Sequence, residues 1–280
     1  MKGMTKYMKN SKIIDFHTHV FPDKIAERAI ASLEERGNIK SFIEGTKDAL
    51  TSSLKSSGID AAVILPIATK PTQNDSINKF AKLINDSDDN LFSFGSVHPD
   101  SEDYEQVIDT IKEYNLPGIK LHPDYQGFFV DDPKYQPLFE YIAKKGLPVT
   151  VHAGFDVAYP AEQHCTPERM SNLLERVPGL TLIAAHLGGY RYWDDVEKYL
   201  VGRNVYIDTS LAYGECPDEQ IKRIIENHHH DKVMFATDSP WRSHKRDLAG
   251  IMSLGLTGDL LHAVLCTNAC KLLNISENDI

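Results

Sequence analysis

Eight short runs of apolar and β-branched residues recur along this chain of 280 residues, and amphipathic stretches separate them. The alternation has the spacing of strand–helix units, and most runs are continuously apolar, as in parallel strands covered on both faces. Eight such units predict an α/β fold, a TIM-type (β/α)8 barrel, with residues 1–280 as a single domain. The expected strands are residues 12–17, 60–67, 91–97, 118–122, 148–152, 180–186, 205–209 and 232–237.

The stretches between these runs predict helices. Thr166 followed by Pro167 is typical of a helix start, because threonine caps the first turn and proline is tolerated at the first helical position. An open doubly wound sheet is the alternative fold, but no glycine-rich dinucleotide-binding turn follows the first run. The expected helices are residues 23–36, 47–57, 73–85, 101–114, 135–145, 167–177, 193–200, 218–228 and 259–273.

The charge balance and the apolar runs argue against several classes of function. The formal net charge is −10 and no basic stripe offsets it, so a nucleic-acid-binding surface is not expected. The longest apolar runs are too short to cross a bilayer, and no apolar signal-peptide core follows the N-terminal lysines. We therefore expect a cytoplasmic protein. The histidines at 228–230 lie at the end of an expected helix, and we expect them on the surface.

Two histidines lie at the end of the first expected strand. A strand places residues i and i+2 on the same face, so His17 and His19 should point the same way, and neutral imidazole is a common ligand of zinc-like metals. Other histidines and an aspartate close or follow later strands, and in a barrel these strand ends meet at the face where active sites lie. This gathering predicts a metal centre with acid–base groups beside it. Its other members are His98, His122, His152, His186 and Asp238.

The later residues also have structural interpretations. Asp238 could cap a helix rather than bind metal or act as a base. His186 could be a core histidine, although the glycines at 188 and 189 suggest a close approach of the backbone to a bound molecule. His152 is followed by the small residues Ala153 and Gly154, which leave room for a ligand.

Lys120 lies two residues before His122, so both side chains should face the same way. A lysine that points into a barrel needs a partner, which could be a salt bridge, a substrate carboxylate or, after carbamylation, a pair of metal ions. The first two interpretations are favoured over the third. We expect substrate contacts at the strand ends and in the loops after them, from Lys120, His122, Tyr125, Phe155 and Trp241.

Five motifs, spread over nearly the whole chain, make this sequence resemble the amidohydrolase superfamily. Within it the chain is most similar to the amidohydrolase-related group that includes aminocarboxymuconate-semialdehyde decarboxylase. The motifs are specific for the superfamily and not for a substrate. They are Asp15-Phe16-His17-Thr18-His19, Gly118-Ile119-Lys120-Leu121-His122-Pro123, Val151-His152-Ala153-Gly154, Ala185-His186-Leu187-Gly188-Gly189 and Phe235-Ala236-Thr237-Asp238-Ser239-Pro240.

The resemblance implies a metal centre with defined ligands. His186 would lie beside the metal as a proton-transfer or carbonyl-polarising group. In binuclear relatives the equivalent histidine and a carbamylated lysine hold a second ion, and Lys120 occupies a comparable strand, so a second ion stays open. The group is usually mononuclear, so we expect one divalent ion, most simply zinc, and a homodimer is a reasonable expectation. The implied ligands, with water at the remaining position, are His17, His19, His152 and Asp238.

This ligand set predicts metal-assisted chemistry. A divalent ion lowers the pKa of bound water from about 15.7 to roughly 7, so hydroxide becomes available at neutral pH. Asp238 can accept the water proton, and His186 can stabilise an oxyanion or protonate a leaving group. We therefore expect a metal-dependent hydrolase of an amide, ester or lactone bond in a small polar molecule. The alternative is a non-oxidative decarboxylase of an unsaturated or aromatic carboxylic acid at the same site.

Two further classes are less favoured. A metal-binding protein without turnover would be expected to have an incomplete ligand set, whereas the set here is complete. A phosphodiesterase of the deoxyribonuclease branch would carry a further carboxylate where this chain has Lys120 and His122, and the acidic charge balance disfavours polyanionic substrates. The ligand types allow zinc, manganese, iron or cobalt.

Overall fold

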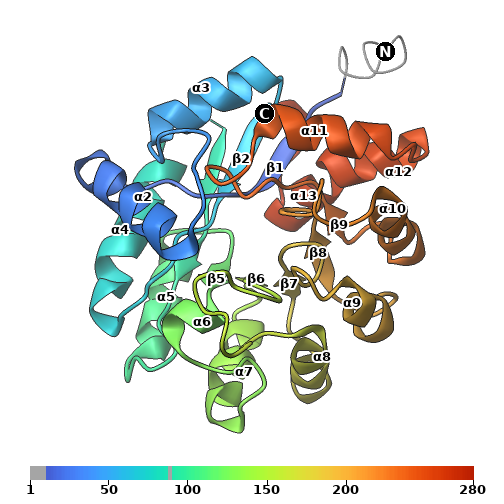
Figure 1. Cartoon of the computed structure of the whole chain (residues 1–280). Helices are drawn as coiled ribbons and strands as arrows, with labels where there is room; N and C mark the ends of the chain where they lie inside the picture. Colours follow the sequence, from blue (N-terminus) through green and yellow to red (C-terminus); the bar gives the residue numbers. More distant parts are fainter. Residues whose placement is uncertain (1–10, 88–89) are drawn as a thin grey trace.

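The computed structural model describes residues 11–87 and 90–280, which form a (β/α)8 barrel with a ring of helices around the strands (Figure 1). All neighbouring strands are parallel and follow the order of the chain, so the predicted fold is confirmed. The strands are β1 (Ile14–Thr18), β2 (Ala61–Ile64), β3 (Leu91–Ser93), β4 (Gly95–Ser96), β5 (Ile119–Leu121), β6 (Val149–Val151), β7 (Leu182–Ala184), β8 (Tyr206–Asp208) and β9 (Val233–Met234).

Most predicted helices are present, with ends that shift by a few residues. The Thr166 side chain accepts a hydrogen bond from the backbone N–H of Arg169, so it caps α8 as expected. The helices are α2 (Asp23–Gly37), α3 (Lys47–Ser57), α4 (Asn74–Asn85), α5 (Tyr104–Glu113), α6 (Pro123–Gln126), α7 (Gln136–Lys144), α8 (Pro167–Arg176), α9 (Trp193–Tyr199), α10 (Asp218–Asn227), α11 (His244–Ser253), α12 (Gly258–His262) and α13 (Asn268–Leu273).

The third predicted strand is divided at Phe94. Before this residue β3 pairs with β2, and after it β4 pairs with β5. The main chain changes partner there: the N–H of Phe94 donates to Ile64 (2.9 Å), and the N–H of Gly95 donates to Gly118 (2.8 Å). Strands β3 and β4 therefore occupy one position in the barrel. The first half pairs with the preceding strand and the second half with the following strand.

Main-chain hydrogen bonds close the barrel between β1 and the end of β9. The N–H of Phe16 donates to Phe235 (2.9 Å), and the N–H of His19 donates to Ser239 (2.6 Å). Between them the N–H of Asp238 donates to the carbonyl of His17 (2.8 Å). The first and last strands thus meet at the C-terminal ends, where the predicted metal ligands lie.

The last part of the chain differs from the prediction. Helix α11 was not predicted, because it is only weakly amphipathic and buries the polar residues His244 and Asp247 with its apolar face. The predicted helix over 259–273 contains a π-helical turn, Ala263–Thr267, whose Val264 carbonyl accepts a hydrogen bond from Phe235 (2.8 Å). The surface prediction for 228–230 was wrong for His228, which is buried and bonds the Val205 carbonyl (2.8 Å).

Among the described residues, no helix has both the length and the apolar character needed to cross a bilayer. The N-terminal lysines on which the signal-peptide argument depends fall within residues 1–10, outside the described residues. The cytoplasmic location stays a prediction.

The strand division at Phe94 leads to a stability prediction. A Cβ atom at Gly118 would lie 2.4 to 2.8 Å from three ring atoms of Phe94, which is fully buried. We expect Gly118→Ala to lower the free energy of unfolding by about 1–3 kcal/mol, the usual cost of overpacking. Gly179→Ala is the control, because nothing lies within 4 Å of its Cβ, and it should stay within about 0.5 kcal/mol of wild type. Urea unfolding measures both; equal midpoints for the two variants would contradict this packing argument.

Candidate functional site

Three of the predicted metal ligands converge at the junction of β1 and β9. The Nε2 atoms of His17 and His19 lie 3.2 Å apart. The Oδ1 atom of Asp238 lies 3.2 Å from the first and 3.0 Å from the second. A tetrahedral ion with ligands at 2.0–2.1 Å has donor–donor edges of about 3.3 Å, so these three atoms approximate one face of a zinc-like site.

The proton positions on these histidines can be assigned from their other nitrogens. The Nδ1 atom of His17 lies 2.9 Å from a carboxylate oxygen of Asp208, and Nδ1 of His19 lies 2.8 Å from the Leu65 carbonyl. Both partners only accept, so both Nδ1 atoms carry the proton and both Nε2 atoms present lone pairs. Burial lowers the pKa of His17, which favours this neutral form. With Asp238 ionised, three acceptor atoms face one another, an arrangement that a cation would stabilise.

Lys120 on β5 supplies one cation to this group. Its side chain is buried, and Nζ lies 3.2 Å from Nε2 of His17. Burial lowers the pKa of Lys120 to about 8. One lone pair binds one cation, so a metal ion on His17 would displace this ammonium from the nitrogen. The role of Lys120 as a substrate-binding residue stays a prediction.

His186, after β7, lies next to His17 and Asp238, whereas His152 lies on the far side of the His186 ring. The His186 ring stacks on His17 with centroids 5.1 Å apart, and its ligating nitrogen lies within 4.8 Å of those of His17 and Asp238. Nε2 of His186 contacts Nδ1 of His152 at 2.8 Å. Nε2 of His152 is buried and has no hydrogen-bond partner. This free nitrogen fits the expected role of His152 as a ligand, which stays a prediction.

A second cluster surrounds His122. Its ring stacks on His152 at 4.1 Å, and Nε2 lies 3.3 Å from Oδ2 of Asp156, which is 3.6 Å from Nε2 of His152. The spacing could hold an ion. However, Nδ1 of His122 accepts the backbone N–H of Tyr125 (3.4 Å), so the proton lies on Nε2 and points at Asp156. The tautomer therefore favours a hydrogen bond here rather than a second metal.

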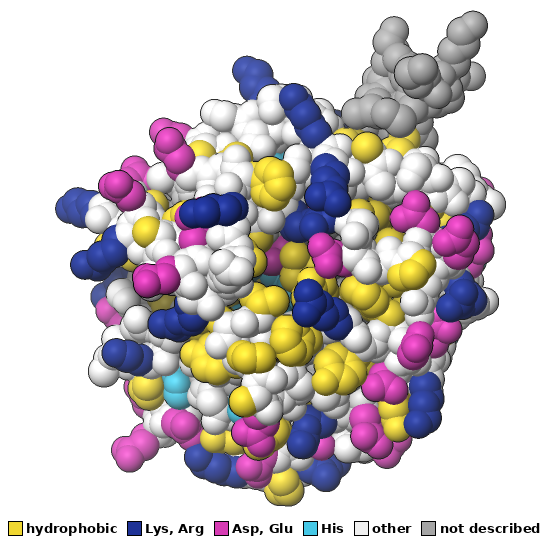
Figure 2. All heavy atoms as spheres, viewed as in Figure 1, with side chains coloured by type: hydrophobic (Ala, Val, Ile, Leu, Met, Phe, Trp, Pro, Cys, Tyr) yellow, Lys and Arg dark blue, Asp and Glu magenta, His cyan; other side chains and the backbone are white. Residues whose placement is uncertain are grey.

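Aromatic residues surround the mouth of the site. The ring of Tyr125 packs on His122 (4.3 Å) and on Tyr159 (5.1 Å). Phe155 lies under the guanidinium of Arg191, 5.1 Å from its ring centre. In the view along the barrel, hydrophobic side chains gather near the centre of the face, with most charged side chains around them (Figure 2).

The other predicted residues lie at the edge of this arrangement. Trp241 is half-buried, and its backbone N–H donates to the Asp238 carbonyl (2.9 Å), so its side chain follows the ligand loop. His98 is buried, and its Nδ1 accepts the N–H of Asp100 (3.2 Å), which is a local loop contact.

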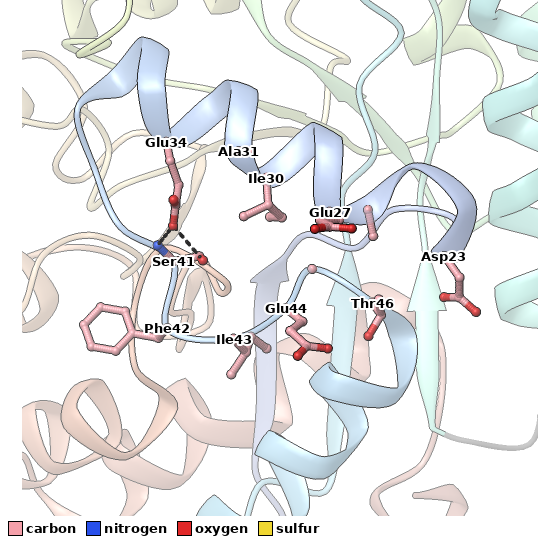
Figure 3. A pocket seen from close by; sticks show the side chains of 12 residues that line it. Asp23, Glu27, Ile30, Ala31, Glu34, Ser41, Phe42, Ile43, Glu44 and Thr46 are labelled. Atoms are coloured by element: carbon pink, nitrogen blue, oxygen red, sulfur yellow. Dashed lines mark hydrogen bonds between the residues drawn. The ribbon is translucent and has the colours of Figure 1, made fainter.

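A large hollow lies away from these residues. It measures about 720 Å³ and lies between α2 and residues 41–46 (Figure 3). Glu34 on its wall accepts hydrogen bonds from the backbone N–H (2.8 Å) and hydroxyl (2.9 Å) of Ser41. None of the predicted site residues lines it.

Beneath the site, burial shifts the pKa of two groups in the direction that favours their neutral forms. Asp15 accepts hydrogen bonds from both the N–H and the hydroxyl of Thr237 (3.0 and 2.6 Å), and burial raises the pKa of Asp15 to about 8. His244 on α11 lies 3.4 Å from this carboxyl group, and its Nε2 has no hydrogen-bond partner. Burial lowers the pKa of His244 to about 4.

Sequence reasoning missed Asp156, Asp208 and Ser210. Asp208 ends an apolar run, the same signal that identified the histidines, and Ser210 follows it at the same barrel face. Asp156 lies four residues after His152 in a loop, where a lone aspartate has no distinguishing pattern. Only the fold shows that these three contact the histidines.

Comparisons with known proteins agree with this fold. A family model described as Amidohydrolase matches residues 14–275. A 5-carboxyvanillate decarboxylase from Sphingomonas paucimobilis has a similar structure, with a TM-score of 0.71 and 15% identity over 95% of this chain and 99% of that chain. A TIM-barrel protein from Bordetella bronchiseptica has a TM-score of 0.73 and 18% identity over 94% of this chain and 98% of that chain. A third structure is a dihydroxybenzoic acid decarboxylase from a Polaromonas species, with bound manganese and 2-nitroresorcinol. It has a TM-score of 0.71 and 15% identity over 96% of this chain and 99% of that chain. No curated protein matches the sequence.

The convergence of His17, His19 and Asp238 leads to a binding prediction. We expect the purified protein to bind about one divalent ion per chain. His17→Ala combined with His19→Ala should abolish tight binding, because two of the facing lone pairs are lost. His229→Ala with His230→Ala, two exposed histidines, should leave binding unchanged. Elemental analysis measures all three proteins; full occupancy in the first double variant would remove the central argument.

The buried His244 leads to a pH prediction. Its pKa is about 4 when folded and about 6.5 when unfolded, so between these values the unfolded chain binds more protons. Relative to His244→Gln, which cannot titrate, wild type should lose up to about 1.4 kcal/mol of unfolding free energy per pH unit as the pH falls from 6.5 to 4. Urea unfolding at several pH values measures the difference, and parallel stability curves would show that His244 is not held neutral.

Proposed function

Because the chain belongs to the amidohydrolase family, we propose that it is a divalent-metal-dependent carboxy-lyase, which removes CO2 from a small aromatic or unsaturated carboxylic acid. The observation that carries the metal dependence is the set of three acceptor atoms, on His17, His19 and Asp238, within 3.2 Å of one another. The choice of reaction is supported by the fold, which is shared with decarboxylases of aromatic acids.

Hydrolysis of an amide, ester or lactone, which the sequence analysis placed first, becomes the second candidate. It would use the same metal centre, and the family description favours it in general terms. The similar structures favour decarboxylation more strongly, and the aromatic residues at the mouth suit a planar ring. We also propose that residues 1–280 act as one enzymatic domain; the homodimer stays a prediction.

The facing atoms of His17, His19 and Asp238 suit a single ion. We propose His152 as the fourth ligand, because its buried Nε2 has no hydrogen-bond partner, although that nitrogen groups with His122 and Asp156 and not with the other three. Zinc suits this nitrogen-rich set, and manganese is bound in the Polaromonas structure. When bound, the ion would polarise a substrate oxygen or lower the pKa of a water molecule.

The side chains around the ion divide the remaining work. Lys120 provides a buried positive charge for the substrate carboxylate or a ring hydroxyl. Tyr125, which packs on His122, and Phe155 would flank the ring. In this proposal His186 and Asp238 hold a proton and transfer it to the ring carbon. The carbon–carbon bond then breaks, its electrons return to the ring, and CO2 leaves, so one proton is consumed and no oxidant is needed.

Product analysis tests the reaction class. The metal-loaded protein is incubated in ¹⁸O-water with dihydroxybenzoates and carboxyvanillate, and in parallel with aryl esters and lactones. We expect CO2 release from an acid, with no ¹⁸O in the aromatic product, and loss of activity after chelation. Incorporation of ¹⁸O into the product of an ester or lactone, with no CO2 from any acid, would establish the hydrolase instead.

Two variants test the proposed roles of Asp238 and His186. Asp238→Asn keeps the side-chain shape but removes the proton-accepting group, so activity should collapse while metal binding only weakens. His186→Asn should leave metal content nearly intact and slow turnover about 10²–10⁴-fold, the usual size of an acid–base contribution. His229→Asn, at an exposed position, is the control. Loss of half of two bound ions in His186→Asn would instead make it a ligand of a second metal.

A further inference from the structure

We infer that Asp208 and Ser210 are positioning residues, which determine the nitrogen that carries the proton in His17, His186 and His152. By doing so they leave Nε2 of His17 and of His152 as lone pairs, which the proposed ion would need. The inference rests on the proposed metal-dependent function, because it concerns how the ligands of that site are prepared.

Asp208, at the end of β8, is surrounded by hydrogen-bond donors. It is fully buried, and Oδ2 accepts the Nδ1 proton of His17 at 2.9 Å. Oδ1 accepts the backbone N–H groups of His186 (3.1 Å) and Ser210 (3.0 Å), and also the Ser210 hydroxyl. Four donors on one side chain require a group that only accepts, and a carboxylate is the side chain that does so.

Through the Ser210 hydroxyl, Asp208 also determines which nitrogen carries the proton in His186 and in His152. Its single proton is donated to Asp208, so its oxygen can only accept, and Nδ1 of His186 at 2.8 Å must be the donor. Nε2 of His186 is then a lone pair, which accepts the Nδ1 proton of His152 at 2.8 Å. Nε2 of His152 is left as the unpartnered, buried lone pair. The donor and the acceptor are therefore fixed in each hydrogen bond that links Asp208, Ser210, His186 and His152.

The same aspartate also holds the backbone that presents His186. His186 and Leu187 have φ values of +63° and +55°, a left-handed conformation that is unfavourable for residues with side chains. The N–H of His186 donates to the Asp208 side chain, and the N–H of Leu187 donates to the Asp208 carbonyl (2.7 Å). These two bonds bring the His186 ring against His17.

The experiment compares Asp208→Asn and Ser210→Ala with Asp247→Asn. Asp247 is also fully buried, and its carboxylate is paired with Arg242 instead of a site histidine. Zinc and manganese affinities are measured by competition with a chelating dye. Nitrogen-15 NMR of histidine-labelled, metal-free protein reports the tautomer of each imidazole. Thermal unfolding of the metal-free proteins reports stability.

We expect Asp208→Asn to weaken metal binding about 10–100-fold, the usual effect of removing a carboxylate behind a histidine ligand. Asp247→Asn should lower stability while affinity stays within about threefold. In Ser210→Ala the His186 proton should move from Nδ1 to Nε2, because its acceptor is lost, while His17 keeps its proton on Nδ1.

Other results would overturn the inference. Equal loss of affinity in Asp208→Asn and Asp247→Asn would show that affinity follows stability alone. Unchanged tautomers in Ser210→Ala would show that the hydroxyl does not direct the series, and this test decides the matter if Asp208→Asn fails to fold. If wild type bound no metal but its histidines had the assigned tautomers, the proposed function would fail and the directed hydrogen bonds would stand.

Discussion

The closure of the barrel between β1 and β9 is the interaction on which the rest of the site depends. Three main-chain hydrogen bonds join these strands, and the central one runs from the N–H of Asp238 to the carbonyl of His17. His19 and Asp238 are 219 positions apart in the chain, yet their ligating atoms lie 3.0 Å apart. The candidate metal centre therefore belongs to the closed barrel and not to any local segment, because no single strand–helix unit contains more than two of its proposed ligands.

Burial explains why the site needs so many matched partners. Asp15, Asp208 and Asp238 are all buried near one another, and burial raises the pKa of each carboxyl group. Burial also lowers the pKa of Lys120 and of His17. Ionised and neutral groups can coexist there only if each donor faces an acceptor, so a change in one side chain alters the protonation preferred by its neighbours.

Sequence periodicity predicted the barrel because eight parallel strands leave a strong apolar signal that helices interrupt. It did not predict the division at Phe94, since a strand that changes partner keeps the same apolar pattern, nor α11, whose buried face is partly polar. His17, His19 and Asp238 were predicted together because strand ends share a face. The contacts of His152 with His186 and Asp156, and the role of Asp208, were not predictable, because they depend on rotamers and on the acceptor behind each ring.

The closure of the barrel by its first and last strands also orders events during synthesis. The two histidines of β1 leave the ribosome early, and Asp238 follows 219 residues after His19. At about 5–20 residues per second, this separation lasts on the order of 10–40 s. During that interval the nascent chain offers a metal only an incomplete set of ligands, which resembles many other histidine pairs in the cell. The full set of proposed ligands therefore comes together only when the last strand docks, so any selection between ions would fall to the folded barrel and not to the emerging peptide.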